Sequence, residues 1–474
     1  METEAVTDSI AGFKTSQGIE MQATLLRLTR FQAAFEVCGP AVLRTSEVLQ
    51  DFKVFVHERP VYCGKAVVSS LVNTGTMVVC EAKLEDAWLD IEALASLDGK
   101  SLCAGFKDFL QQWHRVYRII PEYKAVLADM QSFLTDMRLW LDQVELGVRS
   151  APTGDRIHME RNLAQELGPN TSHALNELFE KFEFITAKVE REAPEQRSAH
   201  SAFAKRLLHP LLLSSPFLYR TFHKPLGYAG DYEMVNMICR SPFEGSTLFA
   251  KIINHWFLGQ APAEAHRNRI HYLVDCLKNT SLSAARKGKP ARMVSVGCGP
   301  SQEIQRFIAE TELANQAQIT LIDFNEETII HTRSVLEEIK RSSNSRANFQ
   351  LVKKSVNQIL KEAGRSIPRT EENTYDFVYC AGLFDYLPDQ ICRRLTNILY
   401  EWVAPGGLLV TTNVDSSNPR RLTMDYVMDW HLIYRNGAEL GALKPQASNG
   451  EPGIVTADVT GVNIHYALRK PERG

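Results

Sequence analysis

The chain has 474 residues, more than a single hydrophobic core usually organises, so two or three domains are expected. Its composition is that of an ordinary globular protein, with 44% hydrophobic and 23% charged residues. This excludes a disordered chain, a collagen-like repeat and a small disulfide scaffold. The formal net charge of -3 provides no general field that would attract nucleic acid or an anionic membrane.

The cysteines and the first residues bear on the cellular compartment. The nine cysteines are never closer than 12 residues apart, so C-x-x-C pairs are absent and reduced thiols are expected. The opening residues, METEAVTDSI, lack the basic start and apolar run of a signal peptide. Because no apolar run approaches the roughly 20 residues that cross a bilayer, we predict a cytoplasmic protein without a membrane span.

Residues 1–95 show the alternating, β-branched pattern of a small all-β barrel. Examples are ATLLRL at residues 23–28, Val54–Val56 and Ala66–Val68, with turn signals at Cys38-Gly-Pro and Asn73-Thr-Gly. The strand spacing, and the phrase VYCGKAVV at residues 61–68, resemble the PilZ barrel, which binds cyclic di-GMP in many bacterial proteins.

The PilZ resemblance does not extend to the dinucleotide-binding motifs. That family uses an R-x-x-x-R arm and a D/N-x-S-x-x-G strand, whereas Arg27 and Arg30 are three residues apart here and the second motif is missing. We therefore expect no useful affinity for cyclic di-GMP. The alternative is a barrel kept for packing or for dimerisation.

Residues 96–199 change to a helical period and predict a helical connector. Its apolar stripes repeat at helical spacing, which indicates core packing, and a homodimer could form through this connector or through the barrel. The stripes comprise Phe106, Phe109, Leu110, Trp113, Tyr117 and Ile120, then Leu127, Met130, Leu134 and Leu141, and finally Leu175, Leu178, Phe179, Phe182, Ile185 and Val189. Residues 200–280 are expected to form a helical lid, and Ser281 to Pro290 a short linker.

Residues 281–474 alternate apolar strands with helical segments. This pattern predicts a doubly wound, Rossmann-like α/β domain with a mainly parallel sheet. The expected strands begin at Met293, Ile319, Phe349, Phe377 and Leu408, and a last strand begins at Val462.

The first of these strands runs into a glycine loop, VSVGCGPSQE at residues 294–303. Gly297 and Gly299 would let the backbone approach a ligand at the carboxyl end of the strand. The third glycine of a dinucleotide fingerprint is replaced by Gln302, which disfavours NAD. Asp323 ends the second strand, where a carboxylate can accept both hydroxyls of a ribose.

Two later features favour S-adenosylmethionine (SAM) over NAD. Ser355-Val-Asn-Gln follows the third strand, and Ala404-Pro-Gly-Gly forms a sharp turn before the fifth. With the glycine loop and Asp323, this order resembles the class I SAM-dependent methyltransferases over about residues 290–470. The resemblance implies cofactor binding by Gly297, Gly299, Glu303, Asp323, Phe324, Ser355 and Val356. One departure is Ser295, which stands where the family usually has an acid before the first glycine.

Three further phrases narrow the resemblance. They are HKPLGYAGDYE at residues 223–233, GLFDYLPD at 382–389 and MDWHLIYR at 428–435. The set is similar to bacterial methyltransferases assigned to the synthesis of 3-hydroxypalmitic acid methyl ester, a quorum signal. The resemblance implies carboxyl O-methylation of a long-chain hydroxy fatty acid, a small-molecule substrate.

The same phrases supply the remaining candidate site residues. Tyr228 and Asp231 lie in a Gly-flanked loop that we expect to fold over the methionine end of SAM, although Asp231 could simply cap a helix. The transferred methyl group of SAM would face residues that follow the fourth strand and residues beyond the fifth. Among them, Arg435 could hold the carboxylate of an acyl substrate, and the alternative is that it lies at the protein surface. These candidates are Phe384, Asp385, Tyr386, Asn413, Trp430, Tyr434 and Arg435, with helix capping the alternative role for Asp385.

The need for a general base depends on the acceptor. A carboxylate is already ionised near pH 7 and needs none, whereas a hydroxyl or amine would need one, for which Asp385 and His431 are the candidates. The histidines show no metal-binding spacing, so no metal is expected. Alternatives are an N- or O-methyltransferase for another metabolite and a ligand-sensing regulatory protein that uses the fold as a scaffold. A nucleic-acid substrate is disfavoured because no N/D-P-P-Y motif follows strand four.

Overall fold

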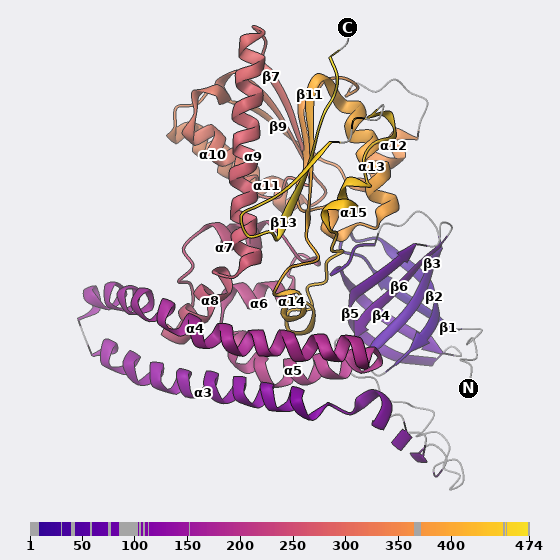
Figure 1. Ribbon diagram of the computed structural model, residues 1–474, viewed down its shortest axis with the longest axis vertical. Coiled ribbons are helices and arrows are strands. Elements are labelled where there is room, and N and C mark those ends of the chain that lie inside the picture. Colours follow the sequence, from indigo (N-terminus) through magenta and orange to yellow (C-terminus); the bar gives the residue numbers. More distant parts are fainter. Residues whose placement is uncertain are drawn as a thin grey trace.

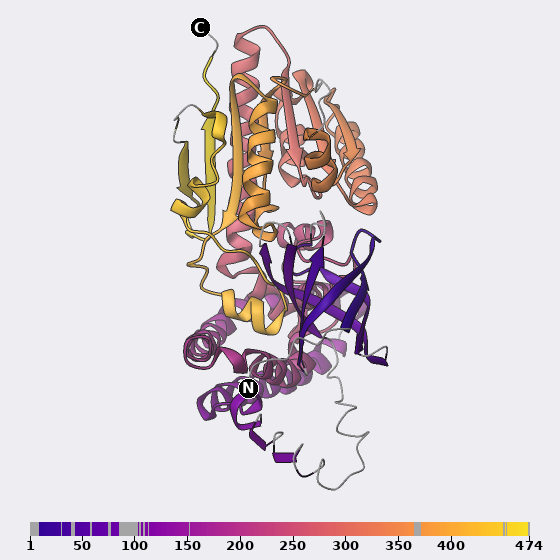
Figure 2. The ribbon, with the colours of Figure 1, turned by 90° about the vertical axis from the view of Figure 1, so that its right-hand side faces the viewer.

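The computed structural model describes most of the chain in three parts (Figures 1 and 2). The described residues are 9–29, 31–38, 43–56, 59–73, 77–84, 113–150, 152–364, 371–448 and 453–472, with Glu451 and a few single positions between 103 and 111. A barrel and a layer of helices lie side by side, and the α/β sheet stands over both (Figures 1 and 2). The predicted fold class, a Rossmann-like α/β sheet preceded by helices and a small N-terminal barrel, is confirmed.

The N-terminal barrel is closed and entirely antiparallel, with the strand order β1-β2-β3-β6-β5-β4. Its core holds Phe13, Phe35 and Phe52, whose ring centroids lie 5.2–5.8 Å apart. Arg27 is exposed and pairs with Glu81, while Arg30 lies outside the described residues. The strands are β1 (Ser9–Lys14), β2 (Glu20–Leu28), β3 (Gln32–Cys38), β4 (Val48–Val56), β5 (Arg59–Asn73) and β6 (Met77–Leu84).

The helical layer is built on two long helices that pack along one another, α3 (Pro121–Arg149) and α4 (Thr153–Glu192). Their contact buries the predicted apolar positions from Leu127 to Leu141 and from Leu175 to Val189, except Leu178 and Ile185, which are partly buried. The core prediction for the preceding stripe is wrong at three positions. Phe106, Leu110 and Trp113 have exposed fractions of 61%, 42% and 42%, so they are not part of a buried core.

Five more helices connect this layer to the sheet. They are α5 (Arg197–Leu212), α6 (Pro216–His223), α7 (Tyr232–Cys239), α8 (Leu248–Leu258) and α9 (Ala261–Arg286). Helix α9 packs on strands β7, β10 and β13 and therefore belongs to the α/β domain. The predicted linker over Ser281–Pro290 is mostly helix, because the last turn of α9 keeps Ser281 and Ala284 buried.

The sheet has seven strands in the order β12-β13-β11-β10-β7-β8-β9, and all pairs are parallel except those of β13. The predicted strands are present, and β12 is an addition. The bounds are β7 (Ala291–Val296), β8 (Ala317–Asp323), β9 (Asn348–Lys353), β10 (Tyr375–Cys380), β11 (Val403–Val414), β12 (Ile454–Ala457) and β13 (Asn463–Arg469).

Alternate residues of these strands enter two separate cores, because successive side chains point to opposite faces of a sheet. Met293 and Tyr379 face α9 to α11, whereas Val294 and Val378 face α12 and α13. The sheet is thus covered on both faces, as a doubly wound fold requires. The remaining helices are α10 (Gln302–Glu310), α11 (Glu326–Ser342), α12 (Val356–Ala363), α13 (Asp389–Trp402), α14 (Arg421–Val427) and α15 (Gly437–Gly441).

A buried ion cluster joins the barrel to the rest of the molecule. The Lys83 ammonium group, on β6, contacts the Asp429 carboxylate at 3.1 Å and donates to the Asp425 carbonyl at 3.0 Å. Lys205 of α5 contacts the other Asp429 oxygen at 2.7 Å. Burial lowers the pKa of Lys83 to about 8. Although burial opposes it, the two ammonium groups hold the pKa of Asp429 well below its usual range.

None of the helices in the described ranges is long and apolar enough to cross a membrane. Every cysteine whose side chain the structure describes is a free thiol.

The ion cluster predicts a large stability loss for Asp429→Asn. Asn tolerates the left-handed backbone at this position, where φ is 47°, so the change acts through charge. Removing the anion leaves the buried Lys83 and the partly buried Lys205 without their anionic partner, which should lower the free energy of unfolding by about 3–5 kcal/mol. Chemical denaturation measures this, with Glu177→Gln in the exposed Glu177–Lys181 pair as the control. Equal midpoints for the two variants would contradict the role given to Asp429.

Candidate functional site

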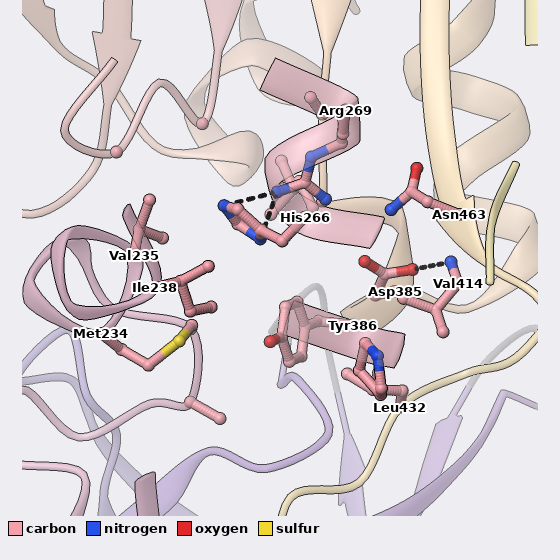
Figure 3. A pocket seen from close by; sticks show the side chains of 18 of the residues that line it. Met234, Val235, Ile238, His266, Arg269, Asp385, Tyr386, Val414, Leu432 and Asn463 are labelled. Carbon is pink, nitrogen blue, oxygen red and sulfur yellow. Dashed lines mark hydrogen bonds between the residues drawn. The ribbon is translucent and has the colours of Figure 1, made fainter. Parts of the chain in front are cut away.

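The candidate site is a cavity of about 210 Å³ at the carboxyl ends of the parallel strands. Strands β7 and β10 are neighbours whose chain connections leave in opposite directions, and such a switch point is where doubly wound sheets bind ligands. Helices α7 and α9, the segment after α14 and one loop of the barrel complete the walls. Figure 3 shows side chains of α7, α9 and the segment after α14 facing a common space.

The glycine loop forms the floor at the end of β7. Gly297 and Gly299 have φ angles of +71° and +52°, which favour glycine. The amides of Gly297 and Cys298 donate to the Ile322 carbonyl at 2.9 and 3.0 Å. These bonds hold the loop against the end of β8 and leave its backbone facing the cavity.

Asp323 lies at the next strand end and is 7% exposed. Its two carboxylate oxygens accept from the amides of Gly299 at 3.1 Å and Asn325 at 3.0 Å. Burial raises the pKa of Asp323, and these amides oppose the rise. Each oxygen has a further lone pair, so the carboxylate can accept hydrogen bonds from a ligand's hydroxyls.

The Gly227–Gly230 loop covers this end of the cavity. Tyr228 lines the cavity and its ring centroid lies 5.1 Å from that of Phe324. Tyr228 is therefore beside Phe324 and near enough to Asp323 for the two groups to interact electrostatically. Gly230 passes close to the Tyr386 hydroxyl, which would lie 2.6 Å from a Cβ at that position.

Asp231 does not line the cavity. Its carboxylate accepts from the Met234 amide at 2.8 Å, capping α7, and pairs with the Arg220 guanidinium at 2.9 Å. The structure therefore supports the helix-cap alternative for Asp231.

Asp385 and Tyr386 form the opposite wall, after β10. One Asp385 oxygen accepts from the Val414 amide at 2.7 Å (Figure 3). Burial raises the pKa of Asp385 to about 6, against the opposing charges of Arg269 and Arg435. The Tyr386 hydroxyl accepts from the Trp430 indole at 3.0 Å, and burial raises its pKa. Tyr386 is therefore neutral near pH 7, and Asp385 is ionised at neutral pH and protonated below about pH 6.

Arg269 and His266 are cavity residues that the sequence analysis did not identify. They lie one turn apart on α9, where the Arg269 guanidinium donates to the His266 ring at 3.0 Å. Burial, with Arg269 next, lowers the pKa of His266 well below its usual value, so the ring is neutral. Among the described carboxylates none is within ion-pair distance of Arg269, which leaves a cation facing the cavity. An i, i+3 pair within an amphipathic helix carries no sequence signal of such a role.

Glu303 lies at the same end of the cavity. It is 7% exposed, accepts from the Tyr379 hydroxyl at 2.8 Å, and burial raises its pKa. Arg269 acts on Glu303 electrostatically without forming an ion pair with it. A carboxylate and a guanidinium thus flank one part of the cavity.

The predicted site residues divide into two groups. Those that line the cavity are Tyr228, Gly297, Gly299, Glu303, Asp323, Phe324, Val356, Asp385, Tyr386 and Trp430. Those that do not are Asp231, Ser355, Phe384, Asn413, His431, Tyr434 and Arg435.

The second group has structural contacts instead. All three guanidinium nitrogens of Arg435 donate to protein oxygens, among them the Asp389 carboxylate, the Phe384 carbonyl and the Asn413 amide oxygen. No donor of Arg435 is left for an acyl carboxylate. Ser355 forms the capping box of α12.

The other two members of this group lie near α14, where His431 is buried and Tyr434 is partly buried. The ring of Tyr434 lies under the Arg421 guanidinium, 4.8 Å from its centroid, and its hydroxyl contacts the Met424 sulfur. His431 donates its amide to Ser46 of the barrel, and its Nδ1 lies 3.0 Å from the Asp425 carboxylate. Within the described part of the chain, no group of three or more side chains could hold a metal ion.

The comparisons with known proteins find similarity of fold. No family model and no curated protein match the chain. Among solved structures, a possible exported protein from Bordetella parapertussis is 16% identical over 54% of this chain and 86% of its own, with a TM-score of 0.39. The N-methyltransferase NodS from Bradyrhizobium japonicum, with S-adenosyl-L-homocysteine, is 16% identical over 51% of this chain and 98% of its own, with a TM-score of 0.30.

A third similar structure is magnesium protoporphyrin IX methyltransferase from Synechocystis with bound SAM. It is 12% identical over 44% of this chain and 81% of its own, with a TM-score of 0.29. Similarity at this level concerns the α/β fold alone, so the function has to be argued from the cavity.

The position of His431 predicts a pH dependence of stability. Burial lowers its pKa to about 4, compared with about 6.5 for an unfolded histidine. Between these values only the unfolded state binds the proton, so stability falls as the pH drops from 6.5 to 4. In His431→Asn, the free energy of unfolding should therefore fall by up to about 3 kcal/mol less over this pH range than in the unaltered protein. Denaturation at several pH values measures it, with exposed His271→Asn as the matched control. An unchanged slope in His431→Asn would contradict the prediction.

Proposed function

We propose that the protein is a SAM-dependent methyltransferase that acts on a small molecule in the cavity at the β7–β10 switch point. The proposal is carried by the order of complementary groups along one cavity. Asp323 offers acceptors for ribose hydroxyls, the glycine loop leaves room for the central part of the ligand, and Arg269 with Glu303 offers one charge of each sign.

The charged pair suits the methionine end of SAM, which carries one carboxylate and one ammonium group. Arg269 would hold the carboxylate, because it is a partly buried cation at the cavity that forms no ion pair among the described residues. Glu303 would accept from the ammonium group. In this assignment Glu303 takes the role of the acidic residue that the resembling family usually has at the position of Ser295.

The acceptor is proposed to lie between Asp385 and the apolar side chains across the cavity. Met234, Val235 and Ile238 of α7 face Tyr386 and Leu432 (Figure 3). An apolar wall of this kind supports the finer proposal from the sequence, carboxyl O-methylation of a long-chain hydroxy fatty acid. In that reaction a carboxylate oxygen attacks the methyl carbon in line as the carbon–sulfur bond breaks, so the protein's task is alignment.

A second candidate is methylation of a hydroxyl group. It is favoured by Asp385, because a carboxyl with a pKa of about 6 is poised to take a proton near neutral pH. The hydroxyl proton would then pass to Asp385 as the oxygen–carbon bond forms.

Cofactor binding tests the proposal directly. Asp323→Ala should weaken the binding of SAM by about 1.5–3 kcal/mol, since it removes hydrogen bonds to a charged acceptor. Isothermal titration calorimetry on the full chain measures this, and Asp376→Ala, at the opposite end of strand β10, is a control carboxylate outside the cavity. Unchanged affinity in Asp323→Ala, or no binding by the unaltered protein, would overturn the assignment.

The pH dependence of the methylation rate on the acidic side distinguishes a carboxylate acceptor from a hydroxyl acceptor. Carboxyl methylation removes no proton, so Asp385→Asn should keep its rate on 3-hydroxypalmitic acid within about tenfold. The measurement is release of S-adenosylhomocysteine between pH 5 and 8. For a hydroxyl acceptor, Asp385 must be ionised, so the rate should fall below about pH 6 and drop about 10²- to 10⁴-fold in Asp385→Asn. A fall in rate below about pH 6, together with the large loss in Asp385→Asn, would overturn the proposal of carboxyl methylation in favour of hydroxyl methylation.

A further inference from the structure

One loop of the N-terminal barrel reaches the cavity. Residues 43–47 precede β4, and two of them, Arg44 and Thr45, line the same cavity as the glycine loop and Asp323. Both are buried, with exposed fractions of 5% and 3%. The barrel is therefore part of the cavity wall and is not only attached beside it.

The loop is held firmly on both sides. The Glu47 carboxylate accepts from the Arg44 amide at 3.0 Å and from the Ser16 hydroxyl at 2.6 Å, which ties the loop to the barrel. The Val48 amide donates to the Gly227 carbonyl at 2.7 Å, and the Ser46 hydroxyl contacts the His431 carbonyl at 3.0 Å. These bonds fix the loop against the segments that carry Tyr228 and Trp430.

Two polar groups of this fixed loop lack hydrogen-bond partners. The Nε of Arg44 and the hydroxyl of Thr45 are buried, and neither has a partner among the described residues. Arg44 forms no ion pair within the described ranges, and its guanidinium carbon lies 4.3 Å from the ring centroid of Phe324. Leaving a buried guanidinium nitrogen and a buried hydroxyl without hydrogen bonds is costly, so two neighbouring groups of this kind at a cavity indicate a ligand-binding position.

We propose that Arg44 and Thr45 bind the adenosine half of SAM, so that the barrel completes the cofactor site. This inference rests on the proposed function. Arg44 lies over Phe324, the residue directly after Asp323 of β8. Glu303, which Arg269 faces electrostatically, bonds instead to Tyr379 of β10, on the other side of β7. A guanidinium group at the position of Arg44 can stack on a ring face and donate from Nε to a ribose oxygen or a ring nitrogen.

The test compares two ligands on the full chain by calorimetry. S-adenosylhomocysteine has both halves of the cofactor, and 5′-methylthioadenosine lacks the amino-acid end. Arg44→Met should weaken both about 10- to 100-fold, and Thr45→Val, which keeps the shape, about 3- to 10-fold. Arg27→Met, which removes an exposed arginine of the same barrel, should leave both affinities unchanged.

The melting temperature distinguishes binding from a structural role. Because Arg44 forms no ion pair within the described ranges and acts on Asp323 only at longer range, Arg44→Met should keep a similar melting temperature without ligand and gain less on adding S-adenosylhomocysteine. Unchanged affinities in Arg44→Met, together with weakened binding in Asp323→Ala, would overturn this inference alone. Loss of S-adenosylhomocysteine binding with 5′-methylthioadenosine unaffected would overturn the adenosine placement. If the unaltered protein bound neither ligand, the proposed function would fall as well.

Discussion

The arrangement of the molecule depends on the buried carboxylate of Asp429. It lies in the segment after α14 and holds Lys83 of the barrel and Lys205 of the helical layer at once. Three segments distant in sequence are thereby fixed at one point. Because Asp429 is fixed, the two residues that follow it are fixed as well. Trp430 donates a hydrogen bond to Tyr386 at the cavity, and His431 donates its amide to Ser46 of the barrel.

Buried charges serve two different purposes in this chain. Those of the Asp429 cluster are matched, which makes the contact between the parts specific. Arg44 and Arg269 form no ion pair among the described residues, although carboxylates act on both at longer range, and both line the cavity. This contrast between paired and unpaired charges marks the cavity as the place where a ligand can interact with the two arginines.

The sheet and its glycine loop could be predicted from the sequence because their signals are local. Apolar runs between helical segments specify buried parallel strands, and Gly297 and Gly299 are needed where the backbone turns with positive φ. Asp323 follows from its place at a strand end. The same locality explains the error at Phe106, Leu110 and Trp113, because helical spacing shows that a face is apolar but does not show whether another element covers it.

The rest of the cavity depends on tertiary contacts that no local pattern contains. From the sequence, Arg435 resembles a ligand-binding arginine because it lies beside aromatic residues. In the structure its N–H groups instead donate to Asp389, Phe384 and Asn413. Arg44, in an unremarkable loop of another domain, has the unsatisfied donor. What separates the two is the number of acceptors that the fold brings to each guanidinium group, which only the folded chain determines.

The contribution of the barrel also restricts how this site can work. A conventional lid would move on its own, but the Gly227–Gly230 loop is bonded to β4 of the barrel through Gly227 and contacts Tyr386 through Gly230. Opening the cavity at this side therefore requires the loop to break its bond with the barrel, or the barrel to move with it. Because Lys83 anchors the barrel to Asp429, the first movement breaks fewer buried contacts and is the one that the structure favours.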